Sequence, residues 1–261
     1  MVKIQEYRIP QSLAEADALL HASPKAELIA GGMWLHMTEK RISTAIDLSR
    51  LGLDRITSDG STLSLGAMTT LRQLETDPLT RDNFGGVLSE CVKPIVGVQL
   101  RNTATVGASV FSKYGFSDLL CALLPLGARV VLYRAGELPL ADFLQRKPER
   151  DILTQIRIPL SARKAAFVSL RRAATDFAMV NLCVSESSDG KYAVAVGARP
   201  GRAIRCPEAE AALARGDLAK AKAAVSALPF GMNIRAGKEY RSAMAAVLLE
   251  RACDKLKEES K

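Results

Sequence analysis

The sequence predicts a protein of mixed helices and strands in two parts, with a boundary near Ser161. Before this boundary, strand-like and helix-like stretches alternate and end at glycine turns. After it, alternating apolar segments are followed by alanine-rich helices. The chain has 261 residues, of which 48% are hydrophobic, and this is enough to bury a core. We therefore expect a globular protein.

The first fifty residues predict a βαβ-like unit. The stretch Lys3–Ile9 reads as a strand, and Ser12–Glu15 (SLAE) has the pattern of a capping box that opens a short helix. Strands are expected next over residues 26–30 and 44–48, and the first of these ends at Gly31-Gly32. A glycine turn at the end of a strand is a common position for a ligand phosphate.

Capping residues and glycines mark the next elements. Thr69 or Thr70 can cap one helix, while Ser117 caps another that is expected to end near Gly127. Glycines break residues 84–110 into short pieces. The predicted elements are strands at 62–67, 129–133 and 152–159, and helices over 69–77 and 117–128.

Beyond the boundary, two alternating segments predict strands at 177–186 and 191–198. Alanine-rich helices are expected from Pro207 to Ala227 and from Lys238 to Lys255. The last helix carries an apolar face of ordinary core type, made by Tyr240, Met244, Val247, Leu248 and Cys253.

Several classes of protein do not fit the composition. The longest uncharged apolar stretch, Leu119–Ala128, is too short to cross a bilayer, and the first ten residues lack the apolar centre of a signal peptide. We therefore expect a cytoplasmic protein with no membrane span. The five cysteines are odd in number and widely spaced, which suggests neither a disulfide framework nor a metal site.

The net charge of +8 is unevenly distributed. Residues 146–261 carry 22 Lys and Arg against 13 Asp and Glu, a net charge of +9, whereas residues 1–145 carry 14 against 15. A basic face can bind nucleic acid, dock an acidic partner or simply face water. With aromatic residues at 5% and no recognisable reading element, we expect no nucleic-acid binding.

Two loops of small residues are candidate anion sites. Glycines at Gly31-Gly32 allow backbone N–H groups to approach a phosphate closely, and Asn102–Ser109 (NTATVGAS) offers hydroxyl donors around Gly107. Two such loops could grip a pyrophosphate, although each alone is more often an ordinary turn. The G-x-G-x-x-G fingerprint and the P-loop lysine pattern are both absent.

The order of six stretches resembles the FAD-binding medium subunits of molybdenum hydroxylases, the family of xanthine dehydrogenase and carbon monoxide dehydrogenase. This resemblance implies an α+β fold, with a vanillyl-alcohol-oxidase-like FAD-binding domain at 1–160 and a C-terminal domain at 161–261. The first domain would have subdomains at about 1–57 and 58–160, and the second a small antiparallel sheet with helices. The stretches are LIAGGMWLHM, RNTATVGASV, FSDLLCALLPLGARVVLY, DILTQIRIP, LRRAATDFAMVNLCVS and EYRSAMAAVLLERA.

The resemblance also implies which residues bind FAD. Two phosphate loops, an acidic position beside the flavin and an apolar position that packs on it map onto this chain. Without the resemblance, Asp118 equally reads as a residue that complements its helix dipole, and Leu153 as core. The implied cofactor-binding residues are Ala30, Gly31, Gly32, Met33, Trp34, Leu35, Thr105, Val106, Gly107, Ala108, Ser109, Asp118 and Leu153.

The chain departs from the family pattern in these loops. Met33 and Trp34 stand where relatives have Thr and a polar residue, and Ala108-Ser109 stands where they have Gly-Asn. Backbone N–H groups can still bind phosphate, because they do not depend on the side chain. The chain's only Trp could stack on the cofactor or lie buried or at a subunit interface. Val168 replaces a Lys that relatives often place near the flavin.

The loop before Asp118 carries two aromatic residues. Tyr114 and Phe116 could shield the flavin or control access of the acceptor, although the sequence favours core packing for Phe116. Neither His21 nor His36 has the spacing of a metal ligand or a catalytic triad, and we assign no catalytic residue.

The resemblance implies an oxidoreductase subunit that transfers electrons. Substrate would be hydroxylated at the molybdenum cofactor of a large partner subunit, and electrons would pass through [2Fe–2S] clusters of a small subunit to FAD here, then to NAD⁺ or another acceptor. The basic C-terminal half is a candidate docking surface. Two alternatives stay open: a stand-alone FAD-dependent reductase or oxidase, and a non-flavin assembly subunit.

Overall fold

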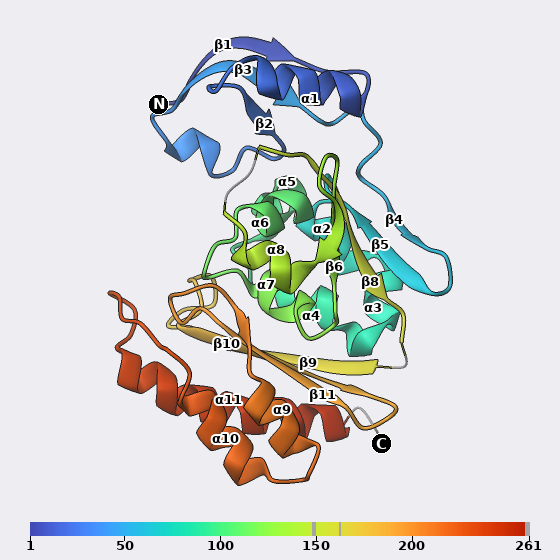
Figure 1. Cartoon of the computed structure of the whole chain (residues 1–261). Helices are drawn as coiled ribbons and strands as arrows, with labels where there is room; N and C mark the ends of the chain where they lie inside the picture. The colour runs from blue at the N-terminus through green and yellow to red at the C-terminus, as the bar shows by residue number, and fades with distance from the viewer. Residues whose placement is uncertain (148–149, 162, 259–261) are drawn as a thin grey trace.

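The computed structural model describes residues 1–147, 150–161 and 163–258, and the chain forms three sheets with helices packed around them (Figure 1). The first sheet is parallel, and the other two are antiparallel. This is the expected α+β fold. None of the described helices is long and apolar enough to span a bilayer.

The N-terminal group is the predicted βαβ-like unit. Its strands lie in the order β1-β3-β2, and α1 packs over a small core beside them. The Ser12 side chain caps α1 by accepting a hydrogen bond from the Glu15 amide. The Glu15 carboxylate, however, accepts from the Gln11 amide and not from the Ser12 amide, so only half of the predicted capping box forms. The elements are β1 (Lys3–Arg8), α1 (Leu13–Ala22), β2 (Glu27–Ile29), η1 (Leu35–Met37) and β3 (Arg41–Asp47).

The middle group surrounds a five-stranded sheet in the order β4-β5-β8-β6-β7. Thr70 and Ser117 cap their helices as expected, whereas α7 ends at Leu123 and not near Gly127, because Pro125 has no N–H and its ring obstructs the helix. The elements are β4 (Ile56–Ser58), β5 (Thr62–Gly66), α2 (Leu71–Thr76), α3 (Pro78–Asp82), η2 (Phe84–Gly86), α4 (Val87–Val92), α5 (Val98–Thr103), α6 (Val106–Phe111), α7 (Asp118–Leu123), β6 (Arg129–Leu132), β7 (Gly136–Pro139), α8 (Leu140–Gln145) and β8 (Leu153–Pro159).

The C-terminal group is a four-stranded sheet, β12-β11-β10-β9, with three helices against one face. Strand β9 has no strong alternating pattern and was not predicted. In the last helix Tyr240 is exposed, while Arg241 beside it is buried. The elements are β9 (Arg163–Leu170), β10 (Val180–Ser187), β11 (Tyr192–Gly197), β12 (Ile204–Arg205), α9 (Pro207–Leu213), α10 (Leu218–Ser226) and α11 (Lys238–Glu258).

Strand β10 is buried on both faces. Val180, Leu182 and Val184 pack against the C-terminal helices, whereas Cys183 belongs to the core of the middle group. Figure 1 shows this sheet lying between α4 and α7 on one side and α9 to α11 on the other. The middle and C-terminal groups therefore share a core.

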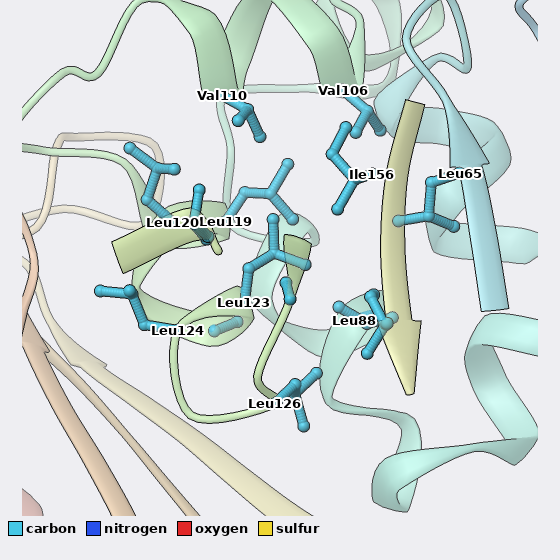
Figure 2. Close-up of a cluster of buried hydrophobic side chains, with 14 of the residues drawn as sticks. Leu65, Leu88, Val106, Val110, Leu119, Leu120, Leu123, Leu124, Leu126 and Ile156 are labelled. Atoms are coloured by element: carbon cyan, nitrogen blue, oxygen red, sulfur yellow. The ribbon is translucent and has the colours of Figure 1, made fainter. Parts of the chain in front are cut away.

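The core of the middle group fixes the position of α6 and α7. Figure 2 shows Val106 and Val110 of α6 pointing toward Leu119 of α7 and Ile156 of β8, and all four side chains are buried. These contacts fix the start of α7, where Asp118 lies, against α6 and β8.

Candidate functional site

A cleft lies where the three groups of elements meet. It encloses about 1300 Å³ of space, part of it open to solvent. One end is formed by the turn after β2, the middle by α5 and α6, and the other end by the start of α7 and the segment 171–177. A cleft between groups of elements is a common place for a cofactor.

The glycine turn fits tightly at this end of the cleft. A Cβ on Gly31 would lie only 1.9 Å from the Thr103 carbonyl oxygen, so the turn lies against the end of α5 with no room for a side chain. Gly32 has a φ of +64°, in the left-handed region, and a Cβ there would meet nothing within 4 Å. Gly31 allows the close approach, and Gly32 leaves open space above the backbone.

The turn also offers backbone donors. Within the described part of the chain, the amides of Gly31, Met33 and Trp34 donate no hydrogen bond, although Leu35 donates to the Gly32 carbonyl. Free N–H groups at such a turn form a concave anion site. The first predicted loop, Ala30–Leu35, therefore lines the cleft with donors available.

The second predicted loop is arranged differently. Val106 and Gly107 donate to the Thr69 and Ala67 carbonyls, and the amides of Ala108 and Ser109 both bond to Thr105. These four N–H groups are therefore engaged within the protein and do not point at a ligand. Thr105, Ala108 and Ser109 still line the cleft.

Three predicted residues do not reach the cleft. Val106 is fully buried in the core, and Gly107 packs so tightly on the turn after β5 that a Cβ would lie 2.6 Å from the Ala67 carbonyl oxygen. Leu153 lies on β8 within the same core. Val168 pairs with Leu182 and packs toward the C-terminal helices, so it also faces away.

Asp118 forms a buried ion pair at the far end of the cleft. Arg171 Nη2 donates to Asp118 Oδ2 at 2.5 Å, and Asn181 Nδ2 donates to Asp118 Oδ1 at 2.7 Å. Burial raises the pKa of Asp118, and the charge and hydrogen bonds of Arg171 and Asn181 oppose that rise. Arg171 also donates to the Asp176 carbonyl, which ties the segment 171–177 to α7.

Arg171 has one donor to spare. Its Nε is buried and has no hydrogen-bond partner among the described residues, while the side chain lines the cleft. A buried donor without an acceptor is costly, so a ligand atom that accepts here would be stabilising.

Four aromatic side chains gather between the two ends of the cleft. Trp34 stacks on Phe177 with ring centroids 6.0 Å apart, and Tyr114 stacks on Phe116 at 5.0 Å. Phe116 and Phe177 lie 4.3 Å apart, and Trp34 contacts all three other rings. We call these four side chains the aromatic cluster; it joins the glycine turn, the loop before α7 and the segment after β9.

Sequence reasoning missed Arg171, Phe177 and Asn181. All three lie in the stretch LRRAATDFAMVN, which carries part of the family resemblance and whose residues from Phe177 on predict a strand, but which predicts no site residue. An asparagine inside an otherwise apolar strand needs a buried partner, and this signal could have pointed to Asp118.

The rim of the cleft carries a strained residue. Val96 is 48% exposed and has a φ of +48°, where a β-branched side chain costs about 1–2 kcal/mol. We expect Val96→Gly to raise the free energy of unfolding by about 1 kcal/mol, after allowing for the extra chain entropy of glycine. Urea unfolding measures this change.

Val98→Gly is the matched control. Val98 is exposed to a similar degree but begins α5, so glycine there should lower the free energy of unfolding by up to about 1 kcal/mol. Effects of the same sign in both variants would contradict the strain at Val96.

Comparisons with known proteins find relatives for both parts of the chain. A family model described as the FAD binding domain in molybdopterin dehydrogenase matches residues 2–161, and one described as the CO dehydrogenase flavoprotein C-terminal domain matches 165–256. The carbon monoxide dehydrogenase medium chain of Hydrogenophaga pseudoflava is 27% identical, over 95% of each chain. The nicotine 6-hydroxylase medium subunit of Paenarthrobacter nicotinovorans is 24% identical, over 94% of each.

Solved structures show the same relationship. A carbon monoxide dehydrogenase from Hydrogenophaga pseudoflava superposes with a TM-score of 0.88 at 27% identity, over 96% of each chain. Quinoline 2-oxidoreductase from Pseudomonas putida 86 superposes with a TM-score of 0.87 at 25% identity, again over 96% of each. The chain therefore belongs to the FAD-binding subunits of the molybdenum hydroxylase family, with FAD as its cofactor.

Proposed function

We propose that this chain carries FAD as the electron-transfer subunit of a molybdenum hydroxylase-type dehydrogenase. Electrons would arrive from [2Fe–2S] clusters of a small partner subunit, after oxidation of substrate at the molybdenum cofactor of a large one. They would leave to NAD⁺ or another acceptor. The observation that carries the proposal is one cleft that has free backbone donors at one end and the Asp118–Arg171 pair at the other, in a chain of this family.

The donors left in the cleft fit a flavin dinucleotide. The amides of Gly31, Met33 and Trp34 suit a diphosphate, and the spare Nε of Arg171 suits a carbonyl or hydroxyl oxygen toward the flavin end. FAD supplies the redox chemistry, since it can take up and release two electrons. The protein's residues bind it, orient it and keep water from it.

Each group of residues has a proposed role. Ala30 to Leu35 hold the diphosphate, while Thr105, Ala108 and Ser109 shape the wall of the cleft. Asp118 is fixed by Arg171 and Asn181, so its carboxylate keeps one orientation toward the cofactor. The aromatic cluster supplies an apolar surface on which a planar ring can stack.

The division of the chain is part of the same proposal. Residues 1–160, with subdomains at about 1–57 and 58–160, would hold FAD, and 161–261 would close the cleft by contributing Arg171 and Phe177. We also propose a cytoplasmic location, because the five cysteines are all buried and form no disulfide.

The partner subunits give the decisive test. The purified chain should be yellow and retain FAD, and mixing it anaerobically with its reduced iron–sulfur subunit should bleach the flavin absorbance. Adding NAD⁺ should restore the absorbance if NAD⁺ is the acceptor. Turnover of an organic substrate by the isolated chain would instead support a stand-alone enzyme, and failure to bind FAD would support an assembly role.

The only tryptophan of the chain provides a further check. Because Trp34 lines the cleft, we expect FAD to quench most of its fluorescence on binding. ADP should compete with FAD for the glycine turn but cause little quenching, since it lacks the flavin. The matched Trp34→Phe variant should lose the signal and still bind FAD; strong emission from the FAD-loaded protein would contradict this placement.

A further inference from the structure

Two large apolar side chains are exposed on one turn of the C-terminal group. Ile234 is 89% exposed and Met232 75%, and both lie on the turn just before α11. In Figure 1 this turn projects at the left of the view, on the side where the loop between β9 and β10 also ends. Two large apolar side chains on a projecting turn suggest a contact surface.

The turn is held rigidly. Asn233 and Ala236 bridge across it, and the Arg235 amide donates to Asn233 Oδ1 at 3.0 Å. Arg241 anchors the turn from below, because its guanidinium is buried and donates to Asn233 Oδ1 at 2.6 Å and to the Ala198 carbonyl at 3.0 Å. Ile234 is thus presented at the tip of a pre-organised turn, which lowers the entropy lost on binding.

The turn is continuous with the mouth of the cleft. Arg235 pairs with Asp176 at 3.0 Å, and its guanidinium lies 4.9 Å from the centre of the Phe177 ring. Phe177 in turn stacks on Trp34, which is partly exposed beside Tyr114. We call this continuous surface the mouth patch, made by Tyr114, Trp34, Phe177, Arg235, Ile234 and Met232.

The surroundings of the mouth patch are basic. Gly231 donates to the Arg199 carbonyl at 2.5 Å, so the segments 171–177, 199–202 and 231–239 meet here. Apart from Arg171, which is buried against Asp118, Lys and Arg on these three segments outnumber Asp and Glu by five to two. Both acidic residues lie beside a basic one, Asp176 next to Arg235 and Glu239 next to Lys238. An apolar centre with a basic rim fits a protein partner whose surface is apolar and acid-rimmed.

We infer that the mouth patch is the docking surface for the iron–sulfur partner subunit, with Ile234 and Met232 as its apolar anchors. This inference rests on the proposed function. A partner bound here would lie directly against the aromatic cluster, and so beside the cofactor to which its electrons must pass. A surface elsewhere on the chain would leave that path longer.

The test replaces the anchors and measures binding. The FAD-loaded Met232→Asp/Ile234→Asp variant should bind the iron–sulfur subunit about 100-fold more weakly than the wild type, in biolayer interferometry, because two central anchors are lost. FAD content and the circular dichroism spectrum should not change, since both side chains are exposed. Lys238→Glu should slow association and reduce its dependence on salt.

A control variant separates this patch from apolar surface in general. Ile4→Asp/Tyr133→Asp changes two exposed side chains, one on β1 and one after β6, away from the mouth patch, and should leave binding unchanged. If the wild type binds the iron–sulfur subunit and the anchor variant binds it equally well, the inference fails but the proposed function stands. If the wild type does not bind the iron–sulfur subunit at all, the proposed function fails as well.

Two further experiments show whether the mouth patch binds something other than the iron–sulfur subunit. If the wild type self-associates in light scattering and the anchor variant does not, the patch binds a second copy and the inference fails. If the wild type floats with anionic phospholipid vesicles and the anchor variant does not, the patch binds a membrane surface and the inference fails as well.

Discussion

Gly31→Ala should destabilise the protein more than any other single methyl group added to the cleft. The new Cβ would lie 1.9 Å from the Thr103 carbonyl oxygen and 2.6 Å from its carbon, and both atoms are backbone. The end of β2 would have to move away from α5, which we expect to cost about 3 kcal/mol or more. Urea unfolding measures the loss, and FAD content after purification should fall to near zero.

Gly32→Ala is the control one residue away. Its Cβ would meet nothing within 4 Å, so only the left-handed φ of +64° opposes alanine, at about 1 kcal/mol. We expect this variant to fold and to keep FAD. Equal losses of stability in the two variants would show that the close approach of the turn to α5 is not the reason for the first glycine.

Arg171→Leu should be the second large effect. It leaves the Asp118 carboxylate buried without its counter-charge, which costs about 3–5 kcal/mol. It also removes the bond to the Asp176 carbonyl and the spare Nε donor in the cleft, so FAD affinity should fall together with stability. Calorimetry of unfolding and FAD titration measure the two losses.

A double variant separates the two roles of Arg171. In Asp118→Asn/Arg171→Leu the buried carboxylate is replaced by a neutral amide, so at least about 2 kcal/mol of stability should return. FAD affinity should stay low, because the arginine donor is still missing. Arg129→Leu, which breaks an exposed ion pair with Glu137, should cost about 1 kcal/mol or less. If Arg129→Leu lowered the free energy of unfolding as much as Arg171→Leu does, burial of the Asp118–Arg171 pair could not be the cause of the larger loss.

The sequence predicted the features of the fold that depend on neighbouring residues. The caps at Ser12, Thr70 and Ser117 are local hydrogen bonds, and all three form. Strand β9 escaped prediction because its pairing depends on β10, which follows it only after a loop. The burial of Arg241 could not be predicted from the sequence either, because its acceptors at Ala198 and Asn233 lie on other segments.

The same distinction applies to the cleft. The glycine turn could be found from the sequence because two adjacent glycines after an apolar run are a local pattern. The second loop predicted donors at Val106 and Gly107, yet the turn after β5 supplies acceptors for both amides from distant sequence. The aromatic cluster combines rings from three segments far apart in the chain, and no spacing rule predicts such a meeting.

Because β10 contributes side chains to cores on both of its faces, the middle and C-terminal groups should melt as one cooperative unit. The small N-terminal sheet packs on a smaller core, to which Ile152 of the middle group contributes, and we expect it to open at lower temperature. Hydrogen exchange should therefore be slowest in β10 and fastest around β1 and β2. The glycine turn would then be the part of the cofactor cradle that opens first when FAD is released.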